Sequence, residues 1–409
     1  MPTDEAGRHL IDTAEVARRL GVRTETVYAY VSRGRLHPVP VDGERRSHFD
    51  PAEVDALAGR AVRPRSRRRP LEIETAVTAI SPTGHRYRGL AATELSRSRR
   101  FEEVAEWLWT GRWPDPPPTW SVEPKLAEAA RAATDALDPR LARPIDRLRL
   151  ALGAASSRDP WRFDLSPESV TTSARSTITA TVLALPTRGP ALDDAHLAAR
   201  LWPRCTGSDA TPELIELLDA ALVLLADHEL AGSTFAARIA ASFRADLGSV
   251  LGAAFGPFAG PRHGAMSIAV EELLAGVEAH GAEPALAHWL SRHDLVPGLG
   301  HPLYPDGDPR AAELLDRLRR VVDGPELEAA EAVIASCGRR GLPPPNVDLA
   351  IGTLSRSTAM VPGAAQACFA VARMAGWVAH ALEEYERPSE LRPRARYVGA
   401  APAEGEPVR

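Results

Sequence analysis

The apolar residues between positions 71 and 400 recur at the spacing of α-helices, and this pattern constrains the fold more than any other feature of the chain. It is clearest in FEEVAEWLWTG (101–111), PELIELLDAALVLLA (212–226) and GAAQACFAVARMAGWVAHALEEYE (363–386). Strand-like alternation is confined within this region to LEIETAVTAISPTGHRYRG (71–89), which predicts a short hairpin before the helices. We therefore expect an all-α domain of closely packed helices, introduced by one hairpin.

Composition limits the class of protein. The 409 residues are 44% hydrophobic and 25% charged, as in ordinary globular proteins. The apolar runs are too short for membrane spans and the first twenty residues lack the apolar centre of a signal peptide, so we expect a cytoplasmic protein with no membrane partner. Cys205, Cys337 and Cys368 are widely separated, which favours reduced, buried thiols and offers no zinc-binding spacing.

The N-terminal 59 residues form a separate module. IDTAEVARRLG (11–21) and VRTETVYAYVSRGRL (22–36) predict two short helices, capped by Asp12 and Thr24. An extended basic stretch and the start of another helix follow. This order of elements resembles the winged helix-turn-helix DNA-binding domain of the MerR and excisionase type.

That resemblance implies contact with duplex DNA. The candidate residues are Thr24, Thr26 and Tyr28 for a groove, and Arg33, Arg45 and Arg46 for the flanking phosphates. Residues 1–59 hold ten acidic residues against eight arginines, so a module used only for protein contact is the alternative. The segment RAVRPRSRRRP (60–70) is expected to be an exposed basic linker that could also touch phosphates, and residues 401–409 are expected to form a tail.

Four short stretches interrupt the helical pattern, and each carries a polar side chain of catalytic type. They are DHELAGSTFAAR with His228, FAGPRHGAMS with His263, GLGHPLYPDGDPRA with His301, and PPNVDLAIG with Asp348. Taken singly, each of these side chains has a structural explanation as a helix cap or a turn residue. Arginines follow at positions 310, 373, 392 and 394.

Together and in this order, the motifs resemble the citrate synthase family. The resemblance rests on Gly-Pro-x-His-Gly, Gly-His followed by Asp-Pro-Arg, Asn-Val-Asp and Arg-Pro-Arg, and on the opening hairpin with its Tyr-Arg-Gly turn. It covers residues 71–400. It implies an all-helical homodimer, in which each subunit has a large domain and a smaller mobile one at roughly 266–358. It also implies condensation of an acyl-CoA with oxaloacetate, with acyl-CoA as substrate and no metal or redox cofactor.

The family's reaction removes a weakly acidic proton beside a thioester while another group steadies the developing enolate oxygen. The resemblance implies that Asp348 is the base, that His263 donates to the enolate, and that His301 protonates the ketone oxygen of oxaloacetate. His263 precedes a predicted helix, whose positive N-terminus favours the neutral imidazole that this role needs.

The substrate-binding residues also come from the resemblance. His228 holds oxaloacetate, and the two carboxylates of that substrate suit the planar double donors of arginine. The implied clamp is Arg310, Arg373 and Arg392, the last reaching in from the partner subunit. Arg394 is the alternative to Arg392, because both flank Pro393.

Coenzyme A is expected at the glycine-rich loop, where the implied residues are Val296, Gly298 and Gly300. Two positions depart from the family's usual pattern: GAMS follows His263, and Pro302 follows His301. Both lie beside the expected acyl-CoA site, so the acyl group stays open between acetyl and propionyl.

Two other classes of function compete with this one. A transcriptional regulator would keep the fold to sense acyl-CoA or oxaloacetate and act on DNA, but binding alone does not require a base such as Asp348. A metal hydrolase using His228, Glu229, His263 and His301 lacks the paired histidine spacing on one helix that such sites use.

Overall fold

The computed structural model divides into two compact units, Met1–Glu74 and Thr75–Arg409, which are described separately. The residues that it describes are 9–20, 24–32, 34, 36–40, 47–54, 72–138, 142–192, 196–387 and 390–395. The expected linker at 60–70 and tail at 401–409 lie outside them, as do Arg33, Arg45 and Arg46.

The N-terminal unit combines two helices with a small antiparallel sheet. Its elements are β1 (Ile11–Asp12), α1 (Thr13–Leu20), α2 (Thr24–Ser32), β2 (Pro38–Val39) and β3 (His48–Phe49), with strand order β1-β3-β2. The side chain of Asp12 accepts the Glu15 amide at 2.8 Å, as expected for the cap of α1. Val16, Val27, Leu36, Phe49 and Val54 make a fully buried core.

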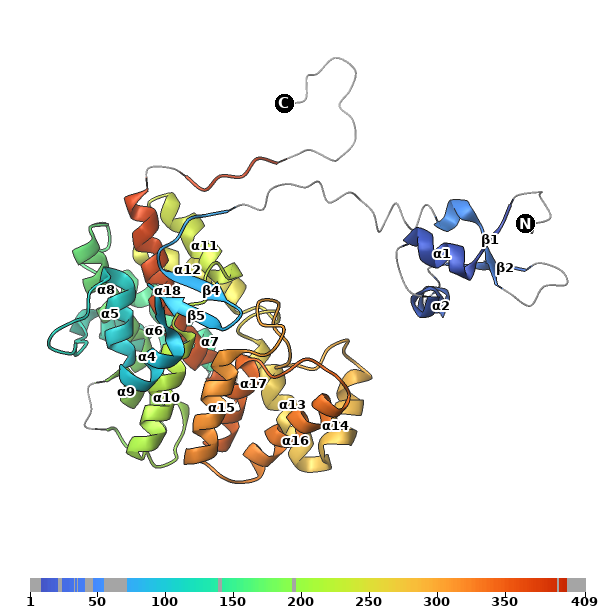
Figure 1. The fold of residues 1–409 in the computed structure, drawn as a ribbon. Helices are drawn as coiled ribbons and strands as arrows, with labels where there is room; N and C mark the ends of the chain where they lie inside the picture. The colour runs from blue at the N-terminus through green and yellow to red at the C-terminus, as the bar shows by residue number, and fades with distance from the viewer. Residues whose placement is uncertain are drawn as a thin grey trace, which may run out of the picture. The chain divides into compact units, whose positions relative to one another are not determined.

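The second unit opens with the predicted hairpin and continues as helices (Figure 1). The strands β4, β5 and β6 pair in that order, with Thr78 opposite Tyr87. The elements are β4 (Thr78–Ser81), β5 (Gly84–Tyr87), β6 (Leu90–Ala91), α4 (Ala92–Ser98), α5 (Phe101–Thr110), α6 (Pro124–Asp135), α7 (Pro144–Ser156), α8 (Pro167–Leu183), α9 (Leu197–Cys205), α10 (Pro212–Leu225), α11 (Gly232–Ser242), α12 (Leu247–Phe258), α13 (Met266–His280), α14 (Ala282–Leu290), α15 (Pro309–Val321), α16 (Pro325–Arg339), α17 (Val347–Ser357) and α18 (Ala364–Glu386).

Helix α18 is the central element of this unit. Nearly all of its 23 residues are buried, and it contacts α5, α7, α8, α10, α11, α12, α13 and α17. Its sequence is rich in alanine, which lets these neighbouring helices pack closely around it. A helix that is apolar on all sides belongs in a core. The few polar residues of α18 therefore lie in the interior of this unit.

The unit has two main apolar cores. The larger one includes α18 and most other helices, whereas α13, α14 and α16 enclose a smaller one together with Val296 and Leu349. Helix α15 lies within the segment 266–358, which was expected to be the smaller subdomain, and it packs Ala311, Leu314 and Leu318 into the larger core. None of the helices in the described ranges is long and apolar enough to cross a membrane.

Candidate active site

A cavity of about 1250 Å³ lies where several helix-connecting segments meet. Nine residues singled out from the sequence line it: His228, His263, Val296, Gly298, Gly300, His301, Arg310, Asp348 and Arg373. They come from the turn after α10, the segment before α13, the loop between α14 and α15, and helices α15, α17 and α18. Arg392 and Arg394 are exposed and are not among the described residues that line the cavity of their own chain.

Two of the histidines stand together on one wall of the cavity. The rings of His228 and His301 are 5.1 Å apart and nearly perpendicular. Tyr304 connects them, since its hydroxyl lies 2.9 Å from His228 Nε2 and its ring stacks on His301 at 4.9 Å. Burial, followed by the positive charge of Arg310, lowers the pKa of both histidines. Both imidazoles are therefore neutral at physiological pH.

The backbone amide of Leu303 donates to His301 Nδ1 at 3.2 Å. This contact determines the tautomer, because a nitrogen that accepts a hydrogen bond cannot carry the proton in a neutral ring. The proton of His301 is thus on Nε2, which makes that nitrogen a donor.

Arg310 is held by a bidentate ion pair. Its Nε and Nη2 lie 3.0 and 2.8 Å from the two carboxylate oxygens of Asp308. Asp308 also caps α15 and accepts the Val347 amide at 3.0 Å, so one carboxylate joins the start of α15 to the start of α17. Arg310 therefore comes to the cavity with its guanidinium already oriented.

Asp348 lies in the first turn of α17, which Asn346 caps. Its Oδ1 is buried and has no hydrogen-bond partner among the described residues. Burial raises the pKa of Asp348 to about 7, although Arg310 pulls it the other way. A carboxyl with this pKa gains and loses a proton near neutral pH, and no hydrogen bond from a described residue competes for its Oδ1. Both properties suit a general base.

His263 lies just before α13 and has a different kind of support. Its Nε2 is 2.8 Å from Ser233 Oγ, and Trp377 Nε1 donates to the same oxygen at 3.2 Å. Ser233 accepts from the indole and keeps one proton that it can donate to His263 Nε2; with that donation, the ring proton lies on Nδ1. Burial, then the charge of Arg373, lowers the pKa of His263 to about 3. The neutral form was expected, but burial is its main cause.

Arg373 is fully buried in α18. Its Nε donates to the Leu225 carbonyl at 2.9 Å, and its guanidinium carbon lies 4.8 Å from the centre of the Phe369 ring. Its Nη2 has no hydrogen-bond partner in the part of the chain that the structure describes. Burial lowers the pKa of Arg373 to about 10, so it remains charged at neutral pH and offers a buried donor to the cavity.

The loop from 296 to 300 is shaped by its glycines. Gly298 and Gly300 have φ angles of +76° and +72°. A Cβ on Gly298 would lie 2.9 Å from side-chain atoms of both Val270 and Leu349. Asn346 donates from its backbone to the Gly298 carbonyl and from its side chain to that of Gly300, each at 2.8 Å. The loop therefore lies tightly against the start of α17, beside Asp348.

Sequence reasoning did not single out Tyr304 or His85 as parts of the site. Tyr304 follows His301 by three residues, a local signal that would have found it. His85 comes from β5, is buried, and its ring lies 5.6 Å from that of His228. No local pattern predicts that proximity. Within the described part of the chain, no group of three or more His, Cys, Asp or Glu side chains is arranged to hold a metal ion.

Comparisons with known proteins agree with this architecture. Residues 70–394 match the family described as citrate synthase, C-terminal domain. The citrate synthase of Deinococcus radiodurans is 31% identical over 76% of this chain and 89% of its own length, and 2-methylcitrate synthase 2 of Corynebacterium glutamicum is 27% identical over 82% and 94%. The crystal structure of citrate synthase from Thermotoga maritima MSB8 superimposes with a TM-score of 0.66 at 27% identity, covering 83% of this chain and 96% of that one. The chain belongs to the citrate synthase family.

Proposed function

We propose that the protein condenses an acyl-CoA with oxaloacetate and hydrolyses the resulting thioester, giving citrate or 2-methylcitrate and free coenzyme A. The observation that carries this proposal is Asp348: a carboxyl whose pKa is raised to about 7 by burial and whose Oδ1 lacks a partner among the described residues, in a cavity shared with neutral histidines and with Arg310 and Arg373. A site that only senses a ligand has no use for such a carboxyl, because binding requires no proton transfer.

The first step generates the nucleophile. Ionised Asp348 takes a proton from the carbon beside the thioester carbonyl. The Nδ1–H of His263 donates to the enolate oxygen that develops, and its low pKa ensures that the imidazole donates as a neutral group. When Ser233 donates to Nε2, with Trp377 donating to Ser233, the ring proton lies on Nδ1, as this role requires.

The second step forms the carbon–carbon bond. The carboxylates of oxaloacetate pair with Arg310 and Arg373, and His228 holds its ketone end. The Nε2–H of His301 gives its proton to the ketone oxygen as the enolate carbon attacks the ketone carbon. Water then cleaves the thioester, which releases coenzyme A and makes the overall reaction favourable.

The third arginine is proposed to come from a second copy of the chain. The Leu391 amide donates to Ser242 Oγ at 3.1 Å, so the segment carrying Arg392 lies at the end of α11. Phe243 is an exposed apolar side chain nearby, and Gly252 and Gly256 on α12 are exposed residues without side chains, which permits close approach. Such a face suits a second copy, and it supports a homodimer in which Arg392 completes the partner's site.

The direct test is release of free thiol when purified protein meets oxaloacetate with acetyl-CoA or propionyl-CoA. Thiol release that requires both substrates is expected, and the ratio of kcat/KM for the two acyl groups assigns the product. Asp348→Asn serves as the matched control, because it keeps the shape of the side chain but cannot take the proton. Absence of thiol release with either acyl-CoA, from protein that binds oxaloacetate, would favour the sensing role instead.

We also propose that the N-terminal unit binds duplex DNA. Tyr28 is 58% exposed on α2, Thr24 is exposed beside it at the start of the helix, and Thr26 is partly buried. These side chains lie on α2, the helix that would enter a DNA groove, and they are therefore available to contact the bases. A gel-shift search of the organism's own genomic fragments at moderate salt tests the proposal. Preferential binding of one fragment that Tyr28→Ala weakens is expected, and equal binding of all fragments would refute it.

A further inference from the structure

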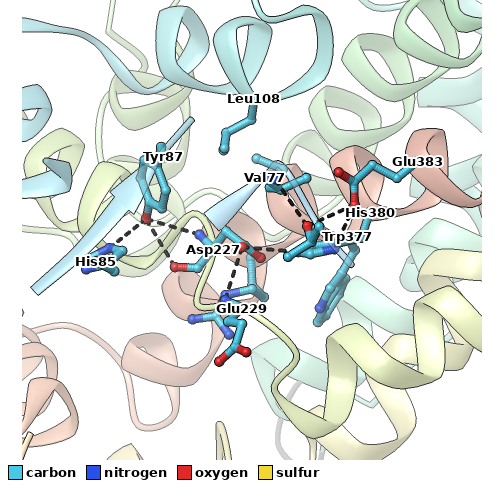
Figure 2. A network of polar contacts seen from close by, with 12 residues as sticks. Val77, His85, Tyr87, Leu108, Asp227, Glu229, Trp377, His380 and Glu383 are labelled. Carbon is cyan, nitrogen blue, oxygen red and sulfur yellow. Dashed lines mark hydrogen bonds and ion pairs between the residues drawn. The ribbon is translucent and has the colours of Figure 1, made fainter. Parts of the chain in front are cut away.

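The turn that carries His228, between Asp227 and Glu229, is stabilised by buried polar groups that do not line the cavity (Figure 2). It lies between α10 and α11, with His228 three residues beyond the last residue of α10. Glu229, the next residue, has a φ angle of +52°, which is unfavourable for any residue with a side chain. Side-chain contacts must therefore stabilise this conformation.

The hydroxyl of Tyr87 on β5 provides one support. It lies 2.9 Å from the Val223 carbonyl, 3.1 Å from the Asp227 amide and 3.1 Å from His85 Nε2. A hydroxyl has one proton to donate and two lone pairs to accept with. Donation to a carbonyl at the end of α10 uses the proton, and the Asp227 amide donates to one lone pair, so this single oxygen ties the end of α10 to the turn.

The side chain of Asp227 provides the second support. Its Oδ2 accepts the Glu229 amide and the Nε2–H of His380, each at 3.2 Å. The first contact stabilises the left-handed residue directly. The second ties the turn to α18, because His380 lies in the last part of that helix. Asp227 and His380 are both fully buried, where hydrogen bonds of this kind are costly to lose.

His380 is itself oriented by Arg238 on α11. The Nη1 of Arg238 lies 3.0 Å from His380 Nδ1, and a guanidinium can only donate, so Nδ1 accepts and the ring proton is on Nε2, facing Asp227. Arg238 pairs in turn with Glu383 at 2.9 Å and with Glu384. Glu383 accepts the Thr75 hydroxyl at 2.8 Å, so the chain of contacts ends at the segment before β4.

Helix α18 approaches this turn unusually closely. The Gly376 amide donates to the Ala226 carbonyl at 3.0 Å, and a Cβ at position 376 would lie 2.3 Å from Asp227 Oδ1. Arg373, one turn earlier on the same helix, donates to the Leu225 carbonyl. One surface of α18 therefore supports the His228 turn and also presents an arginine to the cavity.

We propose that Tyr87, Asp227 and His380 are positioning residues for oxaloacetate, acting through the His228 turn and not on the acyl-CoA. The inference rests on the proposed function, in which His228 holds oxaloacetate. None of the three lines the cavity. Each keeps the His228 imidazole in its place in the cavity wall beside His301.

Three substitutions remove the supports: Tyr87→Phe, Asp227→Ala and His380→Leu. Because each removes a buried hydrogen bond, we expect the oxaloacetate KM to rise by about tenfold while the acyl-CoA KM changes less than about twofold. His380→Gln keeps an N–H donor for Asp227 and should recover most of the oxaloacetate KM. Thr134→Val is the matched control, since it deletes a buried hydroxyl that donates to the Ala184 carbonyl at 3.0 Å, far along the chain from this turn.

The second measurement is amide hydrogen exchange at Asp227 and Glu229 in protein without substrate. Both amides should exchange at least about tenfold faster in Tyr87→Phe and Asp227→Ala than in wild type or Thr134→Val. An unchanged oxaloacetate KM, or equal rises in both KM values, would overturn the proposal. If the wild-type protein does not bind oxaloacetate, the proposed function fails, and exchange at these two amides still decides whether the groups hold the turn.

Discussion

Replacing Asp348 by asparagine should abolish condensation and at the same time stabilise the folded protein. Burial raises the pKa of this carboxyl from 3.8 to about 7. A carboxyl whose pKa is higher in the folded than in the unfolded state destabilises the fold once it is ionised. That penalty is absent below pH 3.8, grows up to about pH 7 and is constant above it.

The size of the effect follows from the same values. A rise in pKa from 3.8 to about 7 lowers the free energy of unfolding by at most roughly 4 kcal/mol at pH 8, and by less than about 2 kcal/mol at pH 5. An asparagine side chain at this position cannot ionise, and it fills the same volume, so the substituted protein avoids the penalty. The prediction is a gain in the free energy of unfolding that is larger at pH 8 than at pH 5.

Urea denaturation of unliganded protein at the two pH values measures the difference. Asp164→Asn is an informative control, because hydrogen bonds from Ser169 and Ser166 lower the pKa of the exposed Asp164. Its replacement should therefore destabilise the fold at pH 8, the opposite sign. If Asp348→Asn is no more stable than wild type at pH 8, burial does not penalise this carboxylate, and the argument for a base active near pH 7 loses its foundation.

Three further predictions concern catalysis. Because Asp348 must be ionised to take a proton, kcat/KM should fall about tenfold between pH 8 and pH 6 in a pH–rate profile, whereas a flat profile would exclude this base. Mixing subunits that carry Arg392→Ala with subunits that carry Asp348→Asn should restore one intact site per mixed dimer, and no recovery after verified subunit exchange would point to Arg394 or to a site within one subunit. Gly298→Ala should raise the acyl-CoA KM and lower stability by about 1–3 kcal/mol, because φ is +76° and the new methyl group meets Val270 and Leu349; calorimetry and thiol release would measure both.

The sequence alone determined the features that depend on short-range pattern. Apolar spacing predicted the hairpin at β4 and β5 and the helices α5, α10 and α18, because the helical and strand periods are properties of neighbouring residues. Glycine and proline identified the segments that carry His228, His263 and His301, and the structure brings these three histidines to one cavity. Those motifs were informative because a loop near a ligand needs residue types that helices avoid.

Only the tertiary structure decided what surrounds each of these groups. Three features join residues that are far apart in sequence, so no local period reveals them. They are the proximity of His85 to His228, the hydrogen bond that His380 donates to Asp227, and the packing of α15 on the larger core. The pKa values of Asp348 and His263 depend on how far each is removed from water and on the charges of Arg310 and Arg373. Desolvation and Coulomb interaction depend on distances in space, and those distances exist only once the helices have packed around α18.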